Sequence, residues 1–156
     1  MFGESIRRFL LALTMLLLSG ITHGGIEVIA WSRATPLGGT SAAIYGRFTN
    51  SSDAPMTVTA VQIDFAHHAM VHETRNEDSM ARMQPVKLVI PAAATVELKP
   101  DAKQIMLMGL NRRLQEGCTY TFRLSWSDRS TTRHQFLTGG MGQLTPPEPA
   151  AAESCL

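Results

Sequence analysis

Apolar and polar residues alternate along most of the chain between Ile26 and Leu137, and a period of two predicts β-strands. The clearest case is the stretch TYTFRLSW, residues 119–126, in which one face of the strand takes four large apolar residues: Tyr120, Phe122, Leu124 and Trp126. Comparable patterns predict strands at residues 42–50, 56–63, 65–74 and 104–110. Because no helical segment lies between these short strands, we expect an antiparallel sandwich or barrel.

The stretch VKLVIPAAATVELKP, residues 86–100, predicts a hairpin. Apolar residues alternate along its first half, at Val86, Leu88 and Ile90, and the PAAA segment supplies turn residues. Val96 and Leu98 alternate along the second half. We therefore expect the two halves to pair with each other.

Residues 1–24 have the layout of a secretory signal peptide, because Arg7 and Arg8 precede an apolar run at 9–18. A run of about ten residues is too short to span a bilayer, where about twenty are needed. We therefore predict an exported protein, cleaved near Gly25, with no membrane span in the mature chain. A single folded domain is expected over residues 25–138, followed by a flexible tail rich in proline and alanine at 139–156.

Charge and motifs exclude two classes of function. The 14 basic and 13 acidic residues of the chain become 12 and 12 when the two arginines and one glutamate of residues 1–24 are removed. A net charge near zero argues against nucleic acid, which demands a cationic face. The sequence also contains no nucleophile elbow, zincin helix or phosphate loop, so we expect no enzyme.

The chain has two cysteines, Cys118 and Cys155. In an oxidising compartment they could form a disulfide if the tail folds back onto the domain. The sequence gives no reason for the tail to be ordered, so the pairing stays open.

Histidine and methionine gather in one part of the chain. The stretch HHAMVHETRNEDSMARM, residues 67–83, holds three of each, and the predicted strand 104–110 adds two methionines. Alternation places His68, Met70 and His72 on one face of the first strand. Alternation likewise projects Gln104, Met106 and Met108 together from the second strand. If the two strands are neighbours, thioether and imidazole donors converge with no carboxylate, a set that prefers Cu(I) over Zn(II), Mg²⁺ or Ca²⁺.

A simpler explanation applies to each of these residues taken alone. Methionine fills irregular cores well, and Met106 and Met108 lie in an apolar strand, so both could be core residues. We expect His67, on the other face of its strand, to be a solvated surface histidine. Clustering favours a metal site, but composition alone does not decide between a metal site and core packing.

Several segments in the same order resemble the PCuAC family of periplasmic copper chaperones. The resemblance covers residues 26–126 and includes AWSRATPLGGTSAAIYGRFTN, HETRNEDSMARMQPV, IPAAATVELKP, IMLMGL and LQEGCTYTFRL. The family motif is His, ten residues, Met, twenty-one residues, then His-x-Met. His72 and Met83 have the first spacing, and Met106 takes the place of the last methionine.

The sequence departs from the motif at the second histidine. Gln104 stands in its place, and twenty residues instead of twenty-one separate it from Met83. The resemblance therefore implies three Cu(I) ligands, His72, Met83 and Met106. Either the site is three-coordinate, or His68 or Met70 completes it. We expect Gln104 to orient His72 through a hydrogen bond.

The resemblance implies a cupredoxin-like antiparallel Greek-key β-sandwich or barrel. It also implies a periplasmic Cu(I) metallochaperone for assembly of the Cu(A) centre of cytochrome c oxidase. The receiving partner would be subunit II of the oxidase or another periplasmic copper protein. The alternative is a module of the same fold that binds little or no metal and contacts a protein partner.

Overall fold

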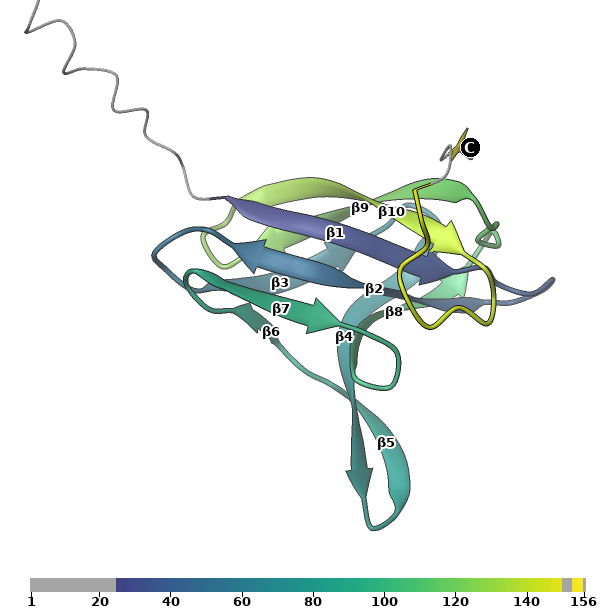
Figure 1. Cartoon of the computed structure of the whole chain (residues 1–156), viewed down its shortest axis with the longest axis horizontal. Coiled ribbons are helices and arrows are strands. Elements are labelled where there is room, and N and C mark those ends of the chain that lie inside the picture. Colours follow the sequence, from purple (N-terminus) through teal and green to yellow (C-terminus); the bar gives the residue numbers. More distant parts are fainter. Residues whose placement is uncertain (1–24, 150–152, 156) are drawn as a thin grey trace, which may run out of the picture.

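Eleven strands make up the regular structure of the part of the chain that the computed structural model describes, residues 25–149 and 153–155 (Figure 1). The predicted signal peptide lies outside these residues. The strands are β1 (Ile26–Arg33), β2 (Ser41–Asn50), β3 (Met56–Gln62), β4 (Ala66–Glu77), β5 (Met80–Pro85), β6 (Leu88–Ile90), β7 (Ala94–Leu98), β8 (Lys103–Leu110), β9 (Cys118–Trp126), β10 (Thr131–Gly139) and β11 (Glu153–Ser154).

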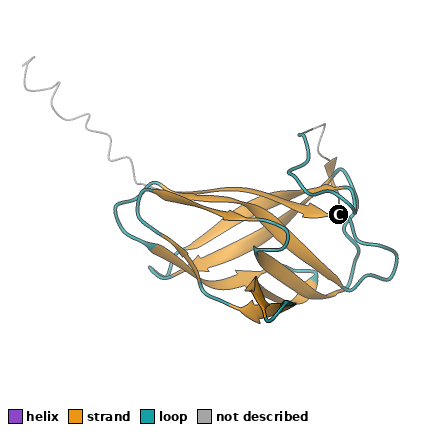
Figure 2. Cartoon of the chain, turned by 60° about the horizontal axis from the view of Figure 1, so that its bottom comes forward, coloured by secondary structure: helices purple, strands orange, loops and turns teal. Residues whose placement is uncertain are grey.

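The strands are hydrogen-bonded in the order β5-β4-β8-β2-β1-β10-β9-β3-β6, with β7 on β2 and β11 on β9 as additional pairs. Most pairs are antiparallel, whereas β1–β10 and β11–β9 are parallel. The sheet curls back over itself into two layers, which Figure 2 shows from a second side. The all-β class expected from the alternation is confirmed.

The core lies between the layers and takes one face of the long strands, except where β4 extends into the exposed arm. The face of β9 predicted from TYTFRLSW is buried, and the intervening residues are only partly buried. Phe48 of β2 and Phe136 of β10 are also buried in this cluster. Period-two patterning therefore decides which side of each strand enters the core, and it leaves the opposite faces of the strands for function.

The predicted hairpin at residues 86–100 is wrong, although both of its strands exist. β6 pairs with β3, and β7 pairs with β2, so the chain passes from one layer to the other between them. The side-chain amide of Asn50 holds this crossing, because its nitrogen donates to the carbonyl oxygens of Ile90 and Pro91, both at 3.2 Å. Alternation marks strands but does not choose their partners.

The end of the tail is attached to the sheet. Cys118, at the start of β9, forms a disulfide with Cys155, and β11 runs parallel to β9 beside it. The pairing that the sequence left open is therefore made. A tail that is flexible over its whole length is not what the structure shows, because the disulfide fixes its end.

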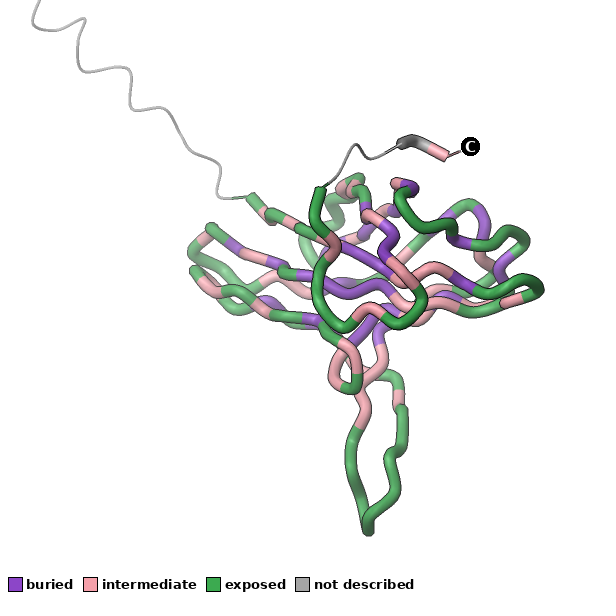
Figure 3. The backbone as a smooth tube through the Cα atoms, turned by 45° about the vertical axis from the view of Figure 1, so that its right-hand side comes forward, coloured by how far each residue is buried: buried purple, intermediate pink, exposed green. Residues whose placement is uncertain are grey.

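A two-stranded arm extends from the sandwich, formed by the second half of β4 and by β5 (Figures 1 and 3). Its turn is Asp78–Ser79, with φ angles of 52° and 65°. Two central residues with positive φ define a type I′ turn, whose twist matches that of paired strands. Nearly all of the arm beyond Thr74 is exposed, so tertiary packing contributes little to its order.

Candidate metal site

The two strands that carry the predicted donors are neighbours. β4 lies between β5 and β8, and its register with β8 sets Met70 opposite Met106. We call each such pair of opposite residues a rung. In the next rung on one side His72 lies opposite Gln104, and in the next rung on the other side His68 lies opposite Met108. Side chains directly opposite in an antiparallel pair share a face, with Cβ atoms about 4.5–5.5 Å apart. Alternate residues of both strands therefore form three adjacent rungs of side chains on one face.

This face is the outer one. The residues between the donors, Val71, Ile105 and Leu107, are buried in the core cluster. Met70 is 43% exposed and Met83 49% exposed. Met106 and Met108 are partly buried, but neither belongs to the core or packs against it. Met56, by contrast, is a partly buried methionine that does pack against the core. Core packing does not explain these methionines.

Met83 reaches the site from β5. It lies opposite Thr74, one rung beyond His72. The Gln104 side-chain nitrogen, Nε2, donates to both sulfur atoms, at 3.3 Å from Met106 Sδ and 3.6 Å from Met83 Sδ. The structure thus brings Met83 and Met106 together around one amide group, although β4 lies between their strands. Gln104 itself is 5% exposed beneath them.

His72 is the imidazole nearest to this group by register. Its Nδ1 lies 3.3 Å from the carbonyl oxygen of Met70, so the tautomer with a proton on Nδ1 donates there and leaves the Nε2 lone pair for a metal. The hydrogen bond that we expected from Gln104 to His72 is not present among the described residues. The amide nitrogen donates to the sulfur atoms of Met83 and Met106 instead.

Two residues of the sequence cluster lie elsewhere. His67 projects from the other face of β4 and packs over Gly109, where a Cβ would come within 2.9 Å of the His67 Cβ. Met80 lies opposite Glu77, on the other face of the arm from Met83. An odd spacing of three residues within a strand puts Met80 and Met83 on opposite faces. The sequence did not reveal this, because its pattern does not predict a strand at residues 80–85.

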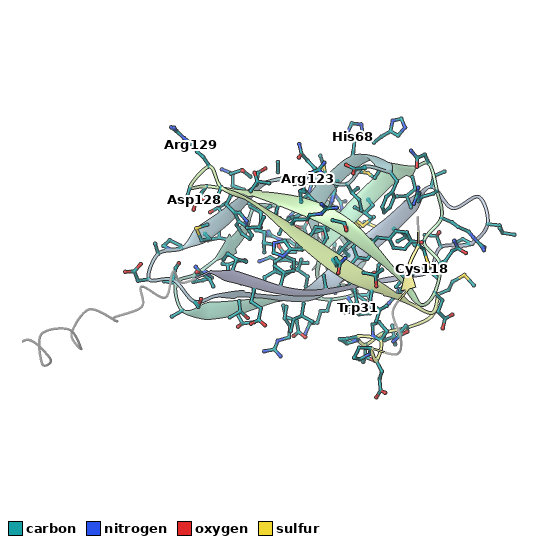
Figure 4. All side chains as sticks on the ribbon, turned by 90° about the horizontal axis from the view of Figure 1, so that it is seen from above. Trp31, His68, Cys118, Arg123, Asp128 and Arg129 are labelled. Atoms are coloured by element: carbon teal, nitrogen blue, oxygen red, sulfur yellow. A yellow bond between two sulfur atoms is a disulfide. The ribbon has the colours of Figure 1, made fainter. Side chains whose placement is uncertain are left out.

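His68 belongs to the outer face but not to the first group. It stands one rung beyond Met70 and projects away from the sheet, as Figure 4 shows. Its neighbour across the strands is Met108. The sequence placed His68 and Met70 equally as candidates for a fourth ligand. The register puts Met70 closer, directly opposite Met106.

The chemistry of the site is soft and uncharged. Within the described residues, no three histidine, cysteine or carboxylate side chains come together in a way that could hold a metal. The nearest carboxylate along β4, Glu73, has its side chain on the opposite face, where it accepts from Arg75 at 2.8 Å. That bond, with weaker help from Lys103, lowers the pKa of Glu73. Neutral thioethers and imidazole suit Cu(I), whereas Ca²⁺ and Mg²⁺ prefer oxygen ligands such as carboxylates, and this group of donors contains no carboxylate.

The fold and the site define an all-β domain that carries exposed sulfur and imidazole donors on one sheet face. Residues 28–137 match the family model LpqE-like, described as "Putative lipoprotein LpqE-like". The chain therefore belongs to the LpqE-like family. No curated protein matches it in sequence. Among the described residues, no helix has the length and hydropathy to cross a membrane.

Solved structures share this fold. The solution structure of CuI-DR1885 from Deinococcus radiodurans is 30% identical, with 72% of this chain and 76% of that chain covered and a TM-score of 0.57. Apo-DR1885 is 28% identical, covering 80% and 89%, with a TM-score of 0.58. The copper-bound PCuAC domain from PmoF2 is 18% identical, covering 75% and 95%, with a TM-score of 0.63. The family resemblance seen in the sequence is thus matched by the fold of PCuAC domains.

Proposed function

We propose that the chain is a Cu(I)-binding metallochaperone whose ligands are His72, Met83, Met106 and Met70. The observation that carries this proposal is the position of the Gln104 amide nitrogen, within 3.6 Å of two sulfur atoms from different strands. A metal ion that took the place of this nitrogen would contact both thioethers. The copper-bound relatives support the choice of metal.

The neutral amide of Gln104 occupies the position that we propose for the cation. Its N–H groups point the positive end of their dipoles at sulfur lone pairs, which are weak acceptors. A hydrogen bond of this kind contributes little net free energy, whereas a Cu(I)–thioether bond uses the donor that soft ions prefer. Binding then requires the Gln104 side chain to rotate away from the two sulfur atoms.

We assign the fourth ligand to Met70 because of its register. Met70 lies directly opposite Met106, and its backbone carbonyl is the group that the His72 ring contacts. A Cu(I) ion held by three thioethers and one imidazole carries no ligand charge, so the complex keeps the ion's single positive charge. We place Gln104 outside the coordination shell, since an amide is a hard ligand for Cu(I).

An anaerobic Cu(I) titration against a chromophoric chelator tests this proposal. The chain is compared with the double variant His72→Ala/Met106→Ala. We expect one tightly held Cu(I) per chain, lost in the double variant. The matched control is His67→Ala/Met80→Leu, because these residues lie nearby on other faces, and it should retain the ion.

Two results would overturn the Cu(I) site. One is a chain that takes no copper from the chelator. The other is equal retention by the chain and the double variant, which would place the copper elsewhere. A loss of copper in the control variant would point to a general disturbance of β4 and the arm instead.

We also propose that the chain works outside the cytoplasm. The apolar segment within residues 1–24 is then removed on export, and residues 25–138 form the working domain. The family description as a lipoprotein supports an exported protein. Thioether ligands suit such a compartment, because methionine cannot be lost to a disulfide as a thiolate can.

We propose the Cu(A) centre of cytochrome c oxidase subunit II as the receiver, directly or through another periplasmic copper protein. The exposure of Met70 and Met83 lets a partner's thiolates replace the ligands one at a time. Mixing the Cu(I)-loaded chain with the metal-free soluble domain of subunit II should move copper to that domain. Retention of all copper by the chain would contradict this receiver while leaving the binding site intact.

A metal-free interaction module is the second candidate. The observation that favours it is that Gln104 satisfies both sulfur atoms without any ion. In that case the titration would show no copper uptake, and the exposed methionines of β4 and β5 would be the surface on which to seek a protein partner.

A further inference from the structure

The outer face carries a second thioether–imidazole pair that the proposed site does not use. His68 and Met108 lie directly opposite each other on β4 and β8, one rung beyond Met70 and Met106. Successive residues on one strand face are about 7 Å apart along the strand, too far for one ion to bind donors at both ends of the three rungs. His68 and Met108 are therefore separate from His72 and Met83.

The local backbone keeps this pair on the outer face. Gly109 follows Met108 with φ of +67°, and His67 packs against it in a space that a Cβ would fill. A slip of the register by one residue would exchange His67 for His68 and lose this fit. The side chain of His68 consequently projects outward, where it is exposed, and Met108 beside it is partly buried.

The surroundings favour a soft monovalent ion. Met108 lies opposite Ser41 on its other side, and Met106 lies opposite Ala43. The partners given by the register on this part of the face are therefore a hydroxyl and a methyl group, with no carboxylate. An imidazole and a thioether whose Cβ atoms lie about 4.5–5.5 Å apart can both reach one ion. Cu(I) accepts two ligands, unlike Ca²⁺ or Mg²⁺, which require six or more oxygen or water ligands.

We propose that His68 and Met108 form a second Cu(I) position on this face, weaker than the first and filled after it. Met70 lies between the two positions and can donate to either. Because His68 is exposed and His72 is only partly so, an ion at the second position is more open to a partner's ligands. The inference rests on the proposed Cu(I) function of the same face.

Methionine methyl signals can distinguish the two positions. The chain is labelled with ¹³C at the methionine methyl groups and titrated anaerobically with Cu(I), supplied as its acetonitrile complex, with the disulfide closed. We expect the signals of Met83 and Met106 to move with the first equivalent. The signal of Met108 should move with the second, with an affinity at least about tenfold lower, or 1.4 kcal/mol.

A matched pair of variants assigns the second step. His68→Ala should abolish the movement of Met108 and leave that of Met83 and Met106. His67→Gln removes the neighbouring imidazole on the other face but keeps the Cβ and Cγ that pack over Gly109, so it should alter neither step. Met80, on the opposite face of the arm, provides an internal reference signal that stays in place.

Each outcome decides between the two proposals. A Met108 signal that does not move by two equivalents, or that moves in His68→Ala, overturns the second position. If Met108 moves with Met106 in a single step, the rungs form one site and the second position is also overturned. The signals of Met83 and Met106 could instead stay in place while that of Met108 moves in the parent chain and not in His68→Ala. In that case the proposed site fails and the second position stands.

Discussion

Gln104 connects the side chains of Met83 and Met106, which lie on strands that are not neighbours. Its amide nitrogen lies within hydrogen-bonding distance of both sulfur atoms, at the position that we propose for the copper ion. The motif comparison identified the position as unusual, but it gave the wrong hydrogen-bond partner. Sequence spacing could not show that a β5 side chain crosses over β4 to reach a β8 side chain.

Replacing Gln104 with histidine tests its role. The imidazole can join the thioethers as a ligand, so we expect Gln104→His to tighten Cu(I) binding at least about tenfold, or 1.4 kcal/mol. Gln104→Leu removes the amide without adding a donor and should leave the affinity within a few-fold. Chelator competition measures both. A histidine variant no tighter than the leucine variant would contradict the position assigned to the ion.

His134 gives the fold a dependence on pH. Burial lowers the pKa of this histidine from its ordinary value of 6.5. Its Nε2 lies 2.6 Å from Thr132 Oγ1, which accepts a hydrogen bond from Trp126 Nε1 at 2.7 Å. The threonine hydroxyl proton is thus free to donate to a neutral imidazole. Protonation of His134 would remove that acceptor.

We expect the chain to lose stability as the pH falls from 7.5 to 5.5. The folded pKa of His134 is below its unfolded value, so the unfolded chain takes up the proton first. The contribution is complete above about pH 6.5 and declines below it. Urea unfolding midpoints at the two pH values should fall less in His134→Gln than in the parent chain, with His67→Gln as the exposed control. Equal falls in the parent chain and in His134→Gln would assign the effect to another group.

At the level of elements, the sequence predicts strands well and their partners poorly. Five stretches with clear alternation became β2, β3, β4, β8 and β9. The 86–100 hairpin failed because pairing depends on Asn50, a residue far from it in sequence. β5 was missed because its residues, MARMQP, show no period-two pattern, since the arm has no buried face.

The arm is the element that carries Met83, and its turn offers a direct test. Asp78 and Ser79 both have positive φ, a conformation that aspartate tolerates but that costs about 1–2 kcal/mol for a residue such as serine. Asp78→Asn/Ser79→Gly supplies the sequence preferred in a type I′ turn. We expect slower amide hydrogen exchange along β5 and tighter Cu(I) binding, because Met83 is better ordered beforehand. Faster exchange in the variant would show that the turn is of another type.

At the scale of the whole molecule, the donor face and the disulfide lie on different strands. The donors belong to β4, β5 and β8, whereas Cys118 is on β9. The all-β class followed from patterning alone, and the family from short motifs. The attachment of the tail did not, because nothing near Cys155 in the sequence indicates a strand.

Removing the disulfide should therefore separate stability from copper binding. The bond joins residues 37 apart, and cross-links of this kind contribute about 2–4 kcal/mol to the free energy of unfolding. We expect Cys118→Ala/Cys155→Ala to unfold at a lower urea concentration and still bind one Cu(I) with unchanged affinity. A variant that folds but loses its copper would place a ligand or a required contact near the tail.

Copper K-edge X-ray absorption of the chain with one equivalent of Cu(I) identifies the ligand atoms themselves. We predict a Cu(I) edge and a first shell dominated by sulfur, with one nitrogen or oxygen scatterer at most. The sulfur contribution should shrink in Met83→Leu and stay unchanged in Met80→Leu. A first shell of nitrogen and oxygen alone would mean that the methionines of β4, β5 and β8 do not bind the ion.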